Sequence, residues 1–329
     1  MLLKTELANI LGYQGELGYE AEYPLLEVPV RVRSNNVQVM KNAGVALGHW
    51  QNCKMDKKEN FPELTVDIIL QETDSGPPPD EYKFTHRYRD GIYLASCGDN
   101  LLLALRNSGK AIAYVTNDLL ENVAAFNWFV VEALSLFLVT YGRRVPIHAS
   151  AVTNGDISIA FIGNSGAGKS SLAYTFLKSG FGLLAEDVIY MGMGDDFKVW
   201  GNSTRIHLLP DAINLFPELE GRIPIKRPNG KVKIQIPISE FSNPEPVFAV
   251  DNMYICVIEP NHLNNKSYIK PVSREYVSNF IMSSLEPGFN LEFENLKESM
   301  DKLLCCNLYL LTAGKNLADI PDMMLELDN

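Results

Sequence analysis

Eight consecutive residues in the middle of the chain have the types and spacing of a phosphate-binding loop: Gly163-Asn164-Ser165-Gly166-Ala167-Gly168-Lys169-Ser170. In such a loop, glycines let successive backbone N–H groups converge on phosphate oxygens, and the lysine brings positive charge to the β- and γ-phosphates. The serine hydroxyl is a ligand for Mg²⁺. The run therefore predicts a solvent-open site for a nucleoside triphosphate and Mg²⁺, formed by these residues and the next one, Ser171.

A pair of adjacent acids, Glu186 and Asp187, follows at the end of an apolar run. We interpret residues 182–190 as a strand. Neighbouring side chains on a strand point to opposite faces, so one acid would hold Mg²⁺ while the other faces a reacting hydroxyl group. ATPases that activate water usually have the Asp before the Glu. The reverse order here favours a reaction other than hydrolysis by an activated water. The alternative to a catalytic role is a solvated charged pair at the end of a strand.

His148, Arg205 and a basic loop at residues 226–233 are the remaining candidate site residues. Taken alone, His148 is most simply a half-buried structural histidine. Arg205, at the end of a predicted strand, and the basic loop would cover the γ-phosphate or the acceptor of the phosphoryl group. An exposed hairpin tip with solvated charges is an equal alternative for the loop.

These segments occur in the same order as in the catalytic domain of bacterial HPr kinase/phosphorylase, and the chain resembles that family. The smaller relatives in the family include HPr-kinase-like serine kinases and the kinases that phosphorylate lasso-peptide precursors. The resemblance covers residues 143–190 and rests on His148-Ala149-Ser150-Ala151-Val152, the glycine-rich loop, and the segment 180–188 with its acid pair.

The resemblance implies an ATP- and Mg²⁺-dependent kinase that transfers the γ-phosphoryl group to a serine-type hydroxyl of a peptide, protein or small molecule. It implies that Lys169 and the loop bind the triphosphate and that Glu186 is the general base, with His148 beside it. Asp187 and Ser170 would hold Mg²⁺. The family usually has Asp where this chain has Glu186. One extra methylene moves the carboxylate by about a bond length, and errors of ~1 Å can cost ~10²-fold in rate.

The elements around these residues follow an α/β pattern. Residues 157–162 have the composition of a buried strand, and residues 170–178 that of a helix whose N-terminus points at the phosphates. With the strand at 182–190, they predict an α/β fold: a P-loop-containing, HPr-kinase-like domain over residues 119–329.

This domain would begin with a long apolar helix at residues 119–142, closed by Gly142-Arg143-Arg144. Its most hydrophobic part is shorter than the ~20 residues of a membrane span and contains Asn127 and Glu132. We therefore predict a helix buried against the later part of the domain.

Residues 1–118 have the pattern of a smaller, β-rich domain. Residues 74–80, rich in proline, predict a loop. The edges of such a sheet would recognise an extended peptide by strand addition, or the sheet would serve only as a packing partner. The apolar runs that predict an antiparallel sheet are residues 26–32, 64–70, 91–95, 101–105 and 111–115.

Composition limits the remaining function classes. The chain has 329 residues, 46% of them hydrophobic, and a formal net charge of −11, so it lacks the basic footprint of a nucleic-acid-binding protein. Its five cysteines have no CxxC spacing, which argues against a zinc site or a disulfide framework. The N-terminus has no stretch typical of a signal peptide, and we expect a cytoplasmic protein with no membrane partner.

Three hypotheses follow from the sequence. The first is the kinase, using ATP or GTP. The second is an NTPase or nucleotide-dependent switch whose acid pair activates water, and the third is a nucleotide-binding scaffold without turnover. The sequence is compatible with a homo-oligomer and with a peptide, protein or small-molecule acceptor.

Overall fold

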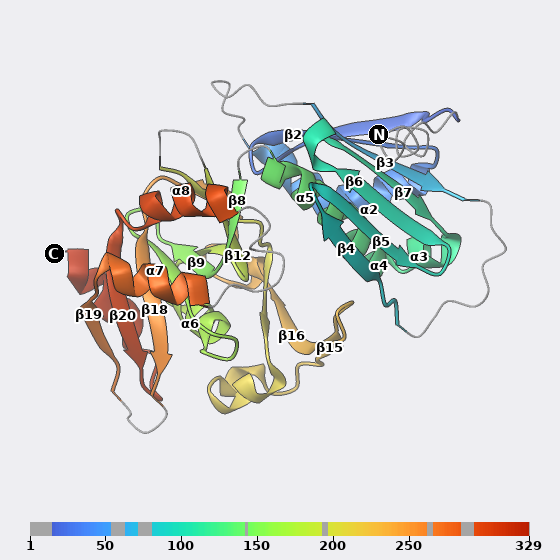
Figure 1. The fold of residues 1–329 in the computed structure, drawn as a ribbon. Coiled ribbons are helices and arrows are strands. Elements are labelled where there is room, and N and C mark those ends of the chain that lie inside the picture. The colour runs from blue at the N-terminus through green and yellow to red at the C-terminus, as the bar shows by residue number, and fades with distance from the viewer. Residues whose placement is uncertain are drawn as a thin grey trace. The chain divides into compact units, whose positions relative to one another are not determined.

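The computed structural model describes residues 15–53, 63–71, 81–141, 144–192, 197–261, 266–283 and 293–328. It is a mixed α/β structure that divides into two compact units, named here unit 1 and unit 2 (Figure 1). Unit 1 comprises residues 1–142 with 227–231, and unit 2 comprises residues 143–226 with 232–329. The predicted loop at residues 74–80 and the pair Gly142-Arg143 lie outside the described residues.

Unit 1 contains a seven-stranded mixed sheet with the strand order β1-β2-β3-β7-β6-β5-β4. β3 runs parallel to both β2 and β7, whereas the other neighbours are antiparallel. The prediction of an antiparallel sheet is therefore wrong for the central strands β2, β3 and β7. Parallel neighbours need a crossover connection, and helix α2 (Val37–Leu47) supplies the one between β2 and β3. The strands are β1 (Tyr19–Leu25), β2 (Val28–Ser34), β3 (Leu64–Leu70), β4 (Thr85–Arg89), β5 (Ile92–Cys97), β6 (Asn100–Leu105) and β7 (Lys110–Val115).

A two-residue turn explains why β4 forms although its residues are mostly polar. Asp90 and Gly91 join β4 to β5 with φ angles of 51° and 76°. Asp-Gly is one of the sequences that favour such turns, because both positions need positive φ. The strand is therefore specified by its turn and its pairing rather than by an apolar pattern, so apolar runs do not predict it.

The helix predicted at residues 119–142 is present as four consecutive segments with an interruption at Asn122. The Asn122 side chain accepts the backbone N–H of Ala125 at 3.1 Å and so begins the second segment. A π-helical stretch, η3, lies in the middle of the run. The segments are α3 (Asn117–Glu121), α4 (Val123–Phe126), η3 (Asn127–Glu132) and α5 (Ala133–Tyr141).

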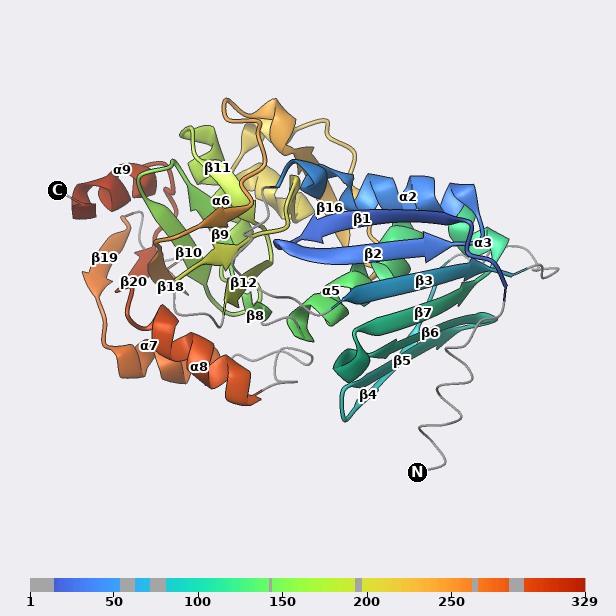
Figure 2. The same ribbon diagram turned by 90° about the horizontal axis from the view of Figure 1, so that it is seen from above.

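This helical run packs within unit 1. The Phe137 ring lies 5.3 Å from that of Tyr93 and 5.8 Å from that of Tyr88, measured between ring centroids, and Figure 2 shows α2 and α5 beside the sheet. Val123–Thr140 is, in the described part of the chain, the one helical stretch with the length and composition of a membrane span, and 56% of it is buried. The expectation that the helix packs against the later domain is wrong, and the division falls at 142/143 rather than at 118/119.

Unit 2 is built on a six-stranded sheet with the order β11-β9-β10-β18-β20-β19. A four-stranded sheet, β17-β13-β12-β8, and a three-stranded sheet, β14-β16-β15, belong to the same unit. The strands are β8 (Arg144–His148), β9 (Ser150–Thr153), β10 (Ser158–Ile162), β11 (Gly182–Ala185), β12 (Val188–Gly192), β13 (Val199–Trp200), β14 (Arg205–Leu208), β15 (Ile225–Lys226), β16 (Val232–Pro237), β17 (Ala249–Val250), β18 (Tyr254–Pro260), β19 (Tyr268–Pro271) and β20 (Asn307–Ala313).

Four helices and several short 3₁₀ turns complete the described elements. The helices are α6 (Lys169–Lys178), α7 (Arg274–Ser283), α8 (Phe293–Leu303) and α9 (Ile320–Leu325). The 3₁₀ turns are η1 (Gly48–Asn52) and η2 (Arg106–Ser108) in unit 1, and η4 (Pro210–Asn214), η5 (Pro217–Leu219), η6 (Ile238–Glu240) and η7 (Glu326–Asp328) in unit 2.

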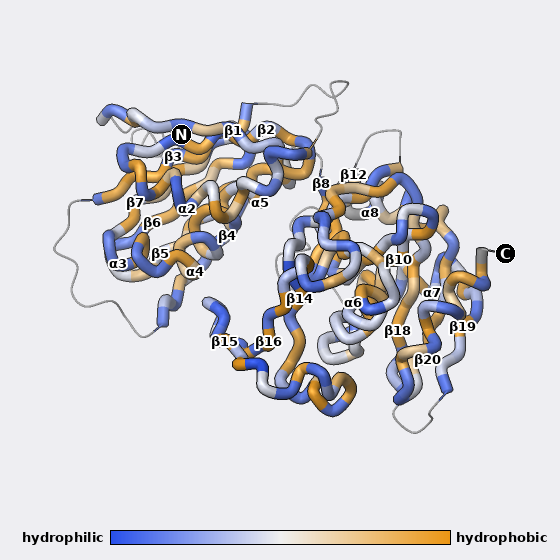
Figure 3. Tube along the Cα trace, turned by 180° about the vertical axis from the view of Figure 1, so that it is seen from behind, coloured by the Kyte–Doolittle hydropathy of each residue, from blue (hydrophilic) through white to orange (hydrophobic). Residues whose placement is uncertain are grey.

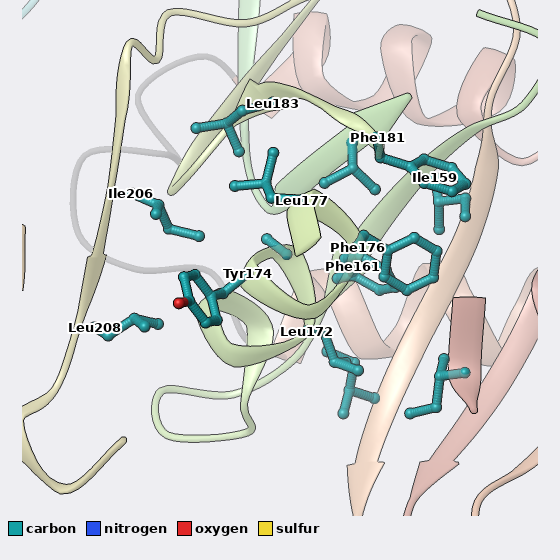
Figure 4. Packing of buried hydrophobic residues seen from close by; sticks show 14 of the residues in the cluster. Ile159, Phe161, Leu172, Tyr174, Phe176, Leu177, Phe181, Leu183, Ile206 and Leu208 are labelled. Atoms are coloured by element: carbon teal, nitrogen blue, oxygen red, sulfur yellow. The ribbon is translucent and has the colours of Figure 1, made fainter. Parts of the chain in front are cut away.

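The six-stranded sheet buries apolar side chains on both faces. On one face, Ile159 and Phe161 of β10 pack with the apolar side of α6, where Phe161 and Phe176 have ring centroids 5.2 Å apart (Figure 4). On the other face, Ala160 belongs to a cluster that includes Val277 of α7. Hydrophobic residues concentrate along the strands in Figure 3. This packing fixes the positions of β10 and α6, and therefore of the glycine-rich loop between them.

Candidate functional site

The glycine-rich loop occupies residues 163–168, between the end of β10 and the first residue of α6. Gly166 and Gly168 have φ angles of 81° and 94°, a region that side chains with a Cβ atom rarely adopt. A Cβ atom on Gly163 would lie 2.9 Å from the Cβ atom of Ala167. All three glycines are therefore required by the backbone of the loop, while Asn164 and Ser165 at its tip are exposed.

Lys169 forms hydrogen bonds with the backbone of its own loop. Its ammonium group donates hydrogen bonds to the carbonyl oxygens of Gly163 at 2.7 Å and Asn164 at 3.2 Å, and the residue is only 7% exposed. The expectation of a solvent-open lysine is therefore wrong. Ser170 and Ser171, in the first turn of α6, are half-buried. The backbone N–H groups at this end of α6 and the positive end of its dipole favour an anion.

The acid pair lies in a bend and not within a strand. β11 ends at Ala185 in the six-stranded sheet, and β12 begins at Val188 in the four-stranded sheet. The prediction of one strand over residues 182–190 is wrong because the chain changes sheets at Glu186 and Asp187. The backbone N–H of Glu186 donates to the Ser203 hydroxyl at 2.8 Å, which helps to hold the bend.

The Glu186 carboxylate is buried and bound by groups from the three-stranded sheet. Its Oε1 atom accepts the backbone N–H of His207 at 3.1 Å, and its Oε2 atom lies 2.6 Å from Nδ1 of the His207 ring. The Lys233 ammonium lies 3.5 Å from Oε1. Asp187 is half-buried, and its backbone carbonyl accepts the N–H of Ala149 at 3.1 Å.

The Glu186 carboxylate contacts the imidazole of His207, which is not among the site residues predicted from the sequence. His148, the histidine expected beside Glu186, lies at the end of β8 opposite Val188 of β12. A sequence signal for His207 existed, because Arg205 and His207 alternate with apolar Ile206 and therefore share one face of a strand.

Pairing between β14 and β16 assembles the polar groups around Glu186. His207 lies opposite Gln235 in the antiparallel register, and Lys233 is two residues before Gln235 on the same face. Arg205, the first residue of β14, is exposed, and its Nη1 atom lies 3.4 Å from the Gln235 side-chain oxygen. Lys233 is thus the member of the basic loop 226–233 that reaches the acid pair.

Sheet topology brings the loop and the acids to one edge of the six-stranded sheet. β10 and β11 are both antiparallel to β9, so they run in the same direction on either side of it. Phe161 and Ala185 pair with the adjacent residues Ser150 and Ala151. Because neighbouring strands are ~4.8 Å apart, the two carboxyl ends lie about 10 Å from each other. His148 is at the same edge, since β9 begins two residues after it.

Oxygen ligands for a hard cation are available at this edge. The Ser170 hydroxyl and the Asp187 carboxylate are of the type that Mg²⁺ prefers, and a Mg²⁺ ion bound with nucleotide takes only one or two protein ligands. Among the residues that the structure describes, no three or more His, Cys, Asp or Glu side chains form a group suited to a metal ion.

No family model and no curated protein matches the chain. Among solved structures, it is similar to the HPr(Ser) kinase/phosphatase from Coxiella burnetii, one of 51 matching chains. The two sequences are 12% identical, the match covers 56% of this chain and 99% of that chain, and the TM-score is 0.28. These values are too low to assign a function, so the function proposed below rests on the residues of this chain.

Proposed function

We propose that the chain is a kinase that uses ATP and Mg²⁺ to phosphorylate a serine-type hydroxyl of a peptide, protein or small molecule. The proposal rests on one observation. A glycine-rich loop with two glycines at positive φ precedes a helix, and it lies at the same edge of the six-stranded sheet as a buried carboxylate. The loop provides a place for the triphosphate, and the carboxylate provides a base next to it.

The triphosphate would lie over the loop and the first turn of α6. Phosphoryl transfer is catalysed mainly by alignment of the reactants and by neutralisation of charge on the transferring group. Lys169 would exchange its hydrogen bonds to loop carbonyls for bonds to phosphate oxygens, which are stronger because both partners are charged. Ser170 and Asp187 would hold Mg²⁺, which supplies further charge neutralisation on the β- and γ-phosphates when bound.

Glu186 would accept the proton of the acceptor hydroxyl. A carboxylate has about four acceptor positions, and the backbone N–H and the ring of His207 occupy two of them here, while the Lys233 ammonium forms an ion pair at 3.5 Å. The remaining capacity lets it bind a hydroxyl group as well. Its fixed orientation at the sheet edge suits a general base, which must lie within hydrogen-bond distance of the proton that it removes.

The proposal is tested by measuring ADP release from Mg·ATP in the presence and absence of acceptors, with serine-containing peptides as the first probes. A kinase releases ADP stoichiometrically with phosphoserine, and only when an acceptor is present. Steady ADP release without an acceptor would indicate an NTPase. Binding of Mg·ATP without turnover under any condition would indicate a scaffold.

Two substitutions test the roles of the acids. Glu186→Gln should lower the transfer rate by ~10²–10⁴-fold with little change in nucleotide affinity, because the amide cannot accept the proton. Asp187→Asn should instead weaken Mg²⁺-dependent nucleotide binding. Calorimetric titration of both variants with Mg·ATP separates the effects, and the reverse pattern would exchange the two roles.

A further inference from the structure

We propose that His207 is a positioning residue that holds the side chain of Glu186 in one orientation. The inference rests on the proposed function, in which Glu186 is the general base. His207 lies on β14, whereas Glu186 lies in the bend between β11 and β12, so the pair joins two different sheets of unit 2.

His207 binds both oxygens of the carboxylate. Its backbone N–H donates to Oε1 and its ring Nδ1 contacts Oε2, at 3.1 and 2.6 Å. Two bonds from a single residue restrain both the position of the carboxylate and its rotation about the last side-chain bond. The two residues are 5% and 6% exposed, so water does not compete for these bonds as it would at the surface.

The other nitrogen of the His207 ring also has a partner. Nε2 lies 3.2 Å from the side-chain oxygen of Gln235, and Nη1 of Arg205 lies 3.4 Å from the same atom. Contacts at both nitrogens hold the ring between Gln235 and Glu186, so the ring itself has little freedom to rotate.

Lys233 compensates the charge of the buried carboxylate. A buried carboxylate is stable only when cations or several hydrogen bonds compensate it. The Lys233 ammonium lies 3.5 Å from Oε1, whereas the closer contact, to Oε2, is made by the His207 ring. Lys233 thus provides the charge, and His207 fixes the orientation.

The two contacts between His207 and the Glu186 carboxylate have a consequence for the reaction. Glutamate has one more rotatable bond than the aspartate usual in the resembled family, so its carboxylate can occupy more positions. Errors of ~1 Å in the position of a reacting group can cost ~10²-fold in rate. His207 removes this freedom, so its loss should lower kcat while the KM for ATP, which depends on the glycine-rich loop, stays the same.

The first test reads the contact between His207 and Glu186 without any turnover. In the nucleotide-free full chain labelled with ¹⁵N, the Nδ1 proton of His207 should be shifted downfield by its short bond to the carboxylate, and the shift should be lost in Glu186→Gln. An Nδ1 proton that does not respond to Glu186→Gln would overturn the inference, even if the chain proves to be a kinase.

The second test compares variants of His207 in the full chain. His207→Asn retains an N–H donor near the place of Nδ1, whereas His207→Leu removes it and keeps a similar volume. Transfer should fall ~10²-fold in the leucine variant and recover by about tenfold or more in the asparagine variant, with the KM for ATP unchanged in both. His49→Leu is the control, because His49 lies in the 3₁₀ turn η1 of unit 1 and not on a sheet edge.

The two proposals fail in different ways. Equal kcat in the leucine and asparagine variants, with both folded, would show that the donor is irrelevant and would overturn the positioning role. If His207→Leu does not fold, the asparagine variant and the nitrogen spectra still decide the question. If the Nδ1 proton of His207 responds to Glu186→Gln in a chain that transfers phosphate to no acceptor, the pairing holds and the kinase assignment falls.

Discussion

At the scale of single residues, Lys169 and Glu186 differ from what their positions in the sequence suggest, because both are buried and paired. Lys169 bonds two carbonyl oxygens of its own loop, and Glu186 bonds His207. Each residue therefore has a structural role in addition to the chemical role proposed for it. Substitutions must separate the two roles, so activity should be measured together with folding.

Lys169→Ala should lower phosphoryl transfer by ~10²–10³-fold or more, because a positive charge is lost next to the transferring group. The change also removes the two hydrogen bonds from Lys169 to carbonyl oxygens of the loop. Nucleotide affinity should therefore fall while the rest of unit 2 stays folded. Transfer assays, Mg·ATP titration and circular dichroism measure these effects.

Lys178→Ala is the matched control at the other end of the same helix. Lys178 forms a surface ion pair with Glu218, and such pairs contribute only about 0–1 kcal/mol. Its activity should equal that of the unsubstituted chain. A Lys169→Ala variant with most of its activity would show that the glycine-rich loop does not bind the triphosphate.

Glu186→Asp tests whether the site is built around the longer acid. Aspartate is one methylene shorter and cannot keep both bonds to His207 without a shift of the bend, so the rate should fall by ~10²-fold. The measurement is kcat at saturating Mg·ATP, with the His207→Asn variant for comparison. Faster turnover in the aspartate variant would contradict a site tuned to glutamate.

At the scale of elements, the loop depends on backbone angles that only glycine adopts easily. Gly168, the residue before α6, has a φ of 94°, and nothing lies within 4 Å of a Cβ atom built on it. A substitution there changes the backbone without creating a clash. The effect on the loop can therefore be predicted from conformational energy alone.

Gly168→Ala should destabilise unit 2 by about 1–2 kcal/mol and weaken Mg·ATP binding, because the alanine disfavours a left-handed conformation. Urea denaturation and nucleotide titration provide the readouts. Gly48→Ala is the control, since Gly48 has a helical φ of −63° and open space around its Cβ position. Similar effects of the two substitutions would contradict the backbone argument.

At the scale of the whole molecule, the division at 142/143 redefines which fragment should fold. The helical run that ends at Tyr141 packs within unit 1, so a fragment starting at residue 119 would expose its apolar face. We expect residues 143–329 to unfold cooperatively and to bind Mg·ATP, and residues 119–329 to aggregate. Analytical ultracentrifugation and calorimetry distinguish the two.

Cys256 reports whether the fragment is folded. Burial raises the pKa of its thiol to about 12, so it should resist thiol reagents in folded unit 2, whereas exposed Cys305 reacts. A fragment of residues 143–329 that protects Cys256 and binds Mg·ATP but phosphorylates no acceptor would support acceptor recognition by residues 1–142. Full transfer by the fragment would exclude that role.

The sequence by itself determined the glycine-rich loop and the elements next to it. Gly166 and Gly168 specify a local backbone conformation, and the apolar residues of β10 specify a buried strand directly before it. These features depend on residues close together in the chain, so a local pattern suffices to predict them. The acid pair could be recognised for the same reason, although its place in a bend could not.

Only the tertiary structure decided what surrounds the acids and where the units divide. His207 is 21 residues from Glu186 in sequence. It reaches the carboxylate because β14 of the three-stranded sheet lies against the bend between β11 and β12. The assignment of the helical run before Tyr141 to unit 1 depends on aromatic packing with β4 and β5. Such contacts depend on how separate segments pack together, and no spacing within a single segment encodes them.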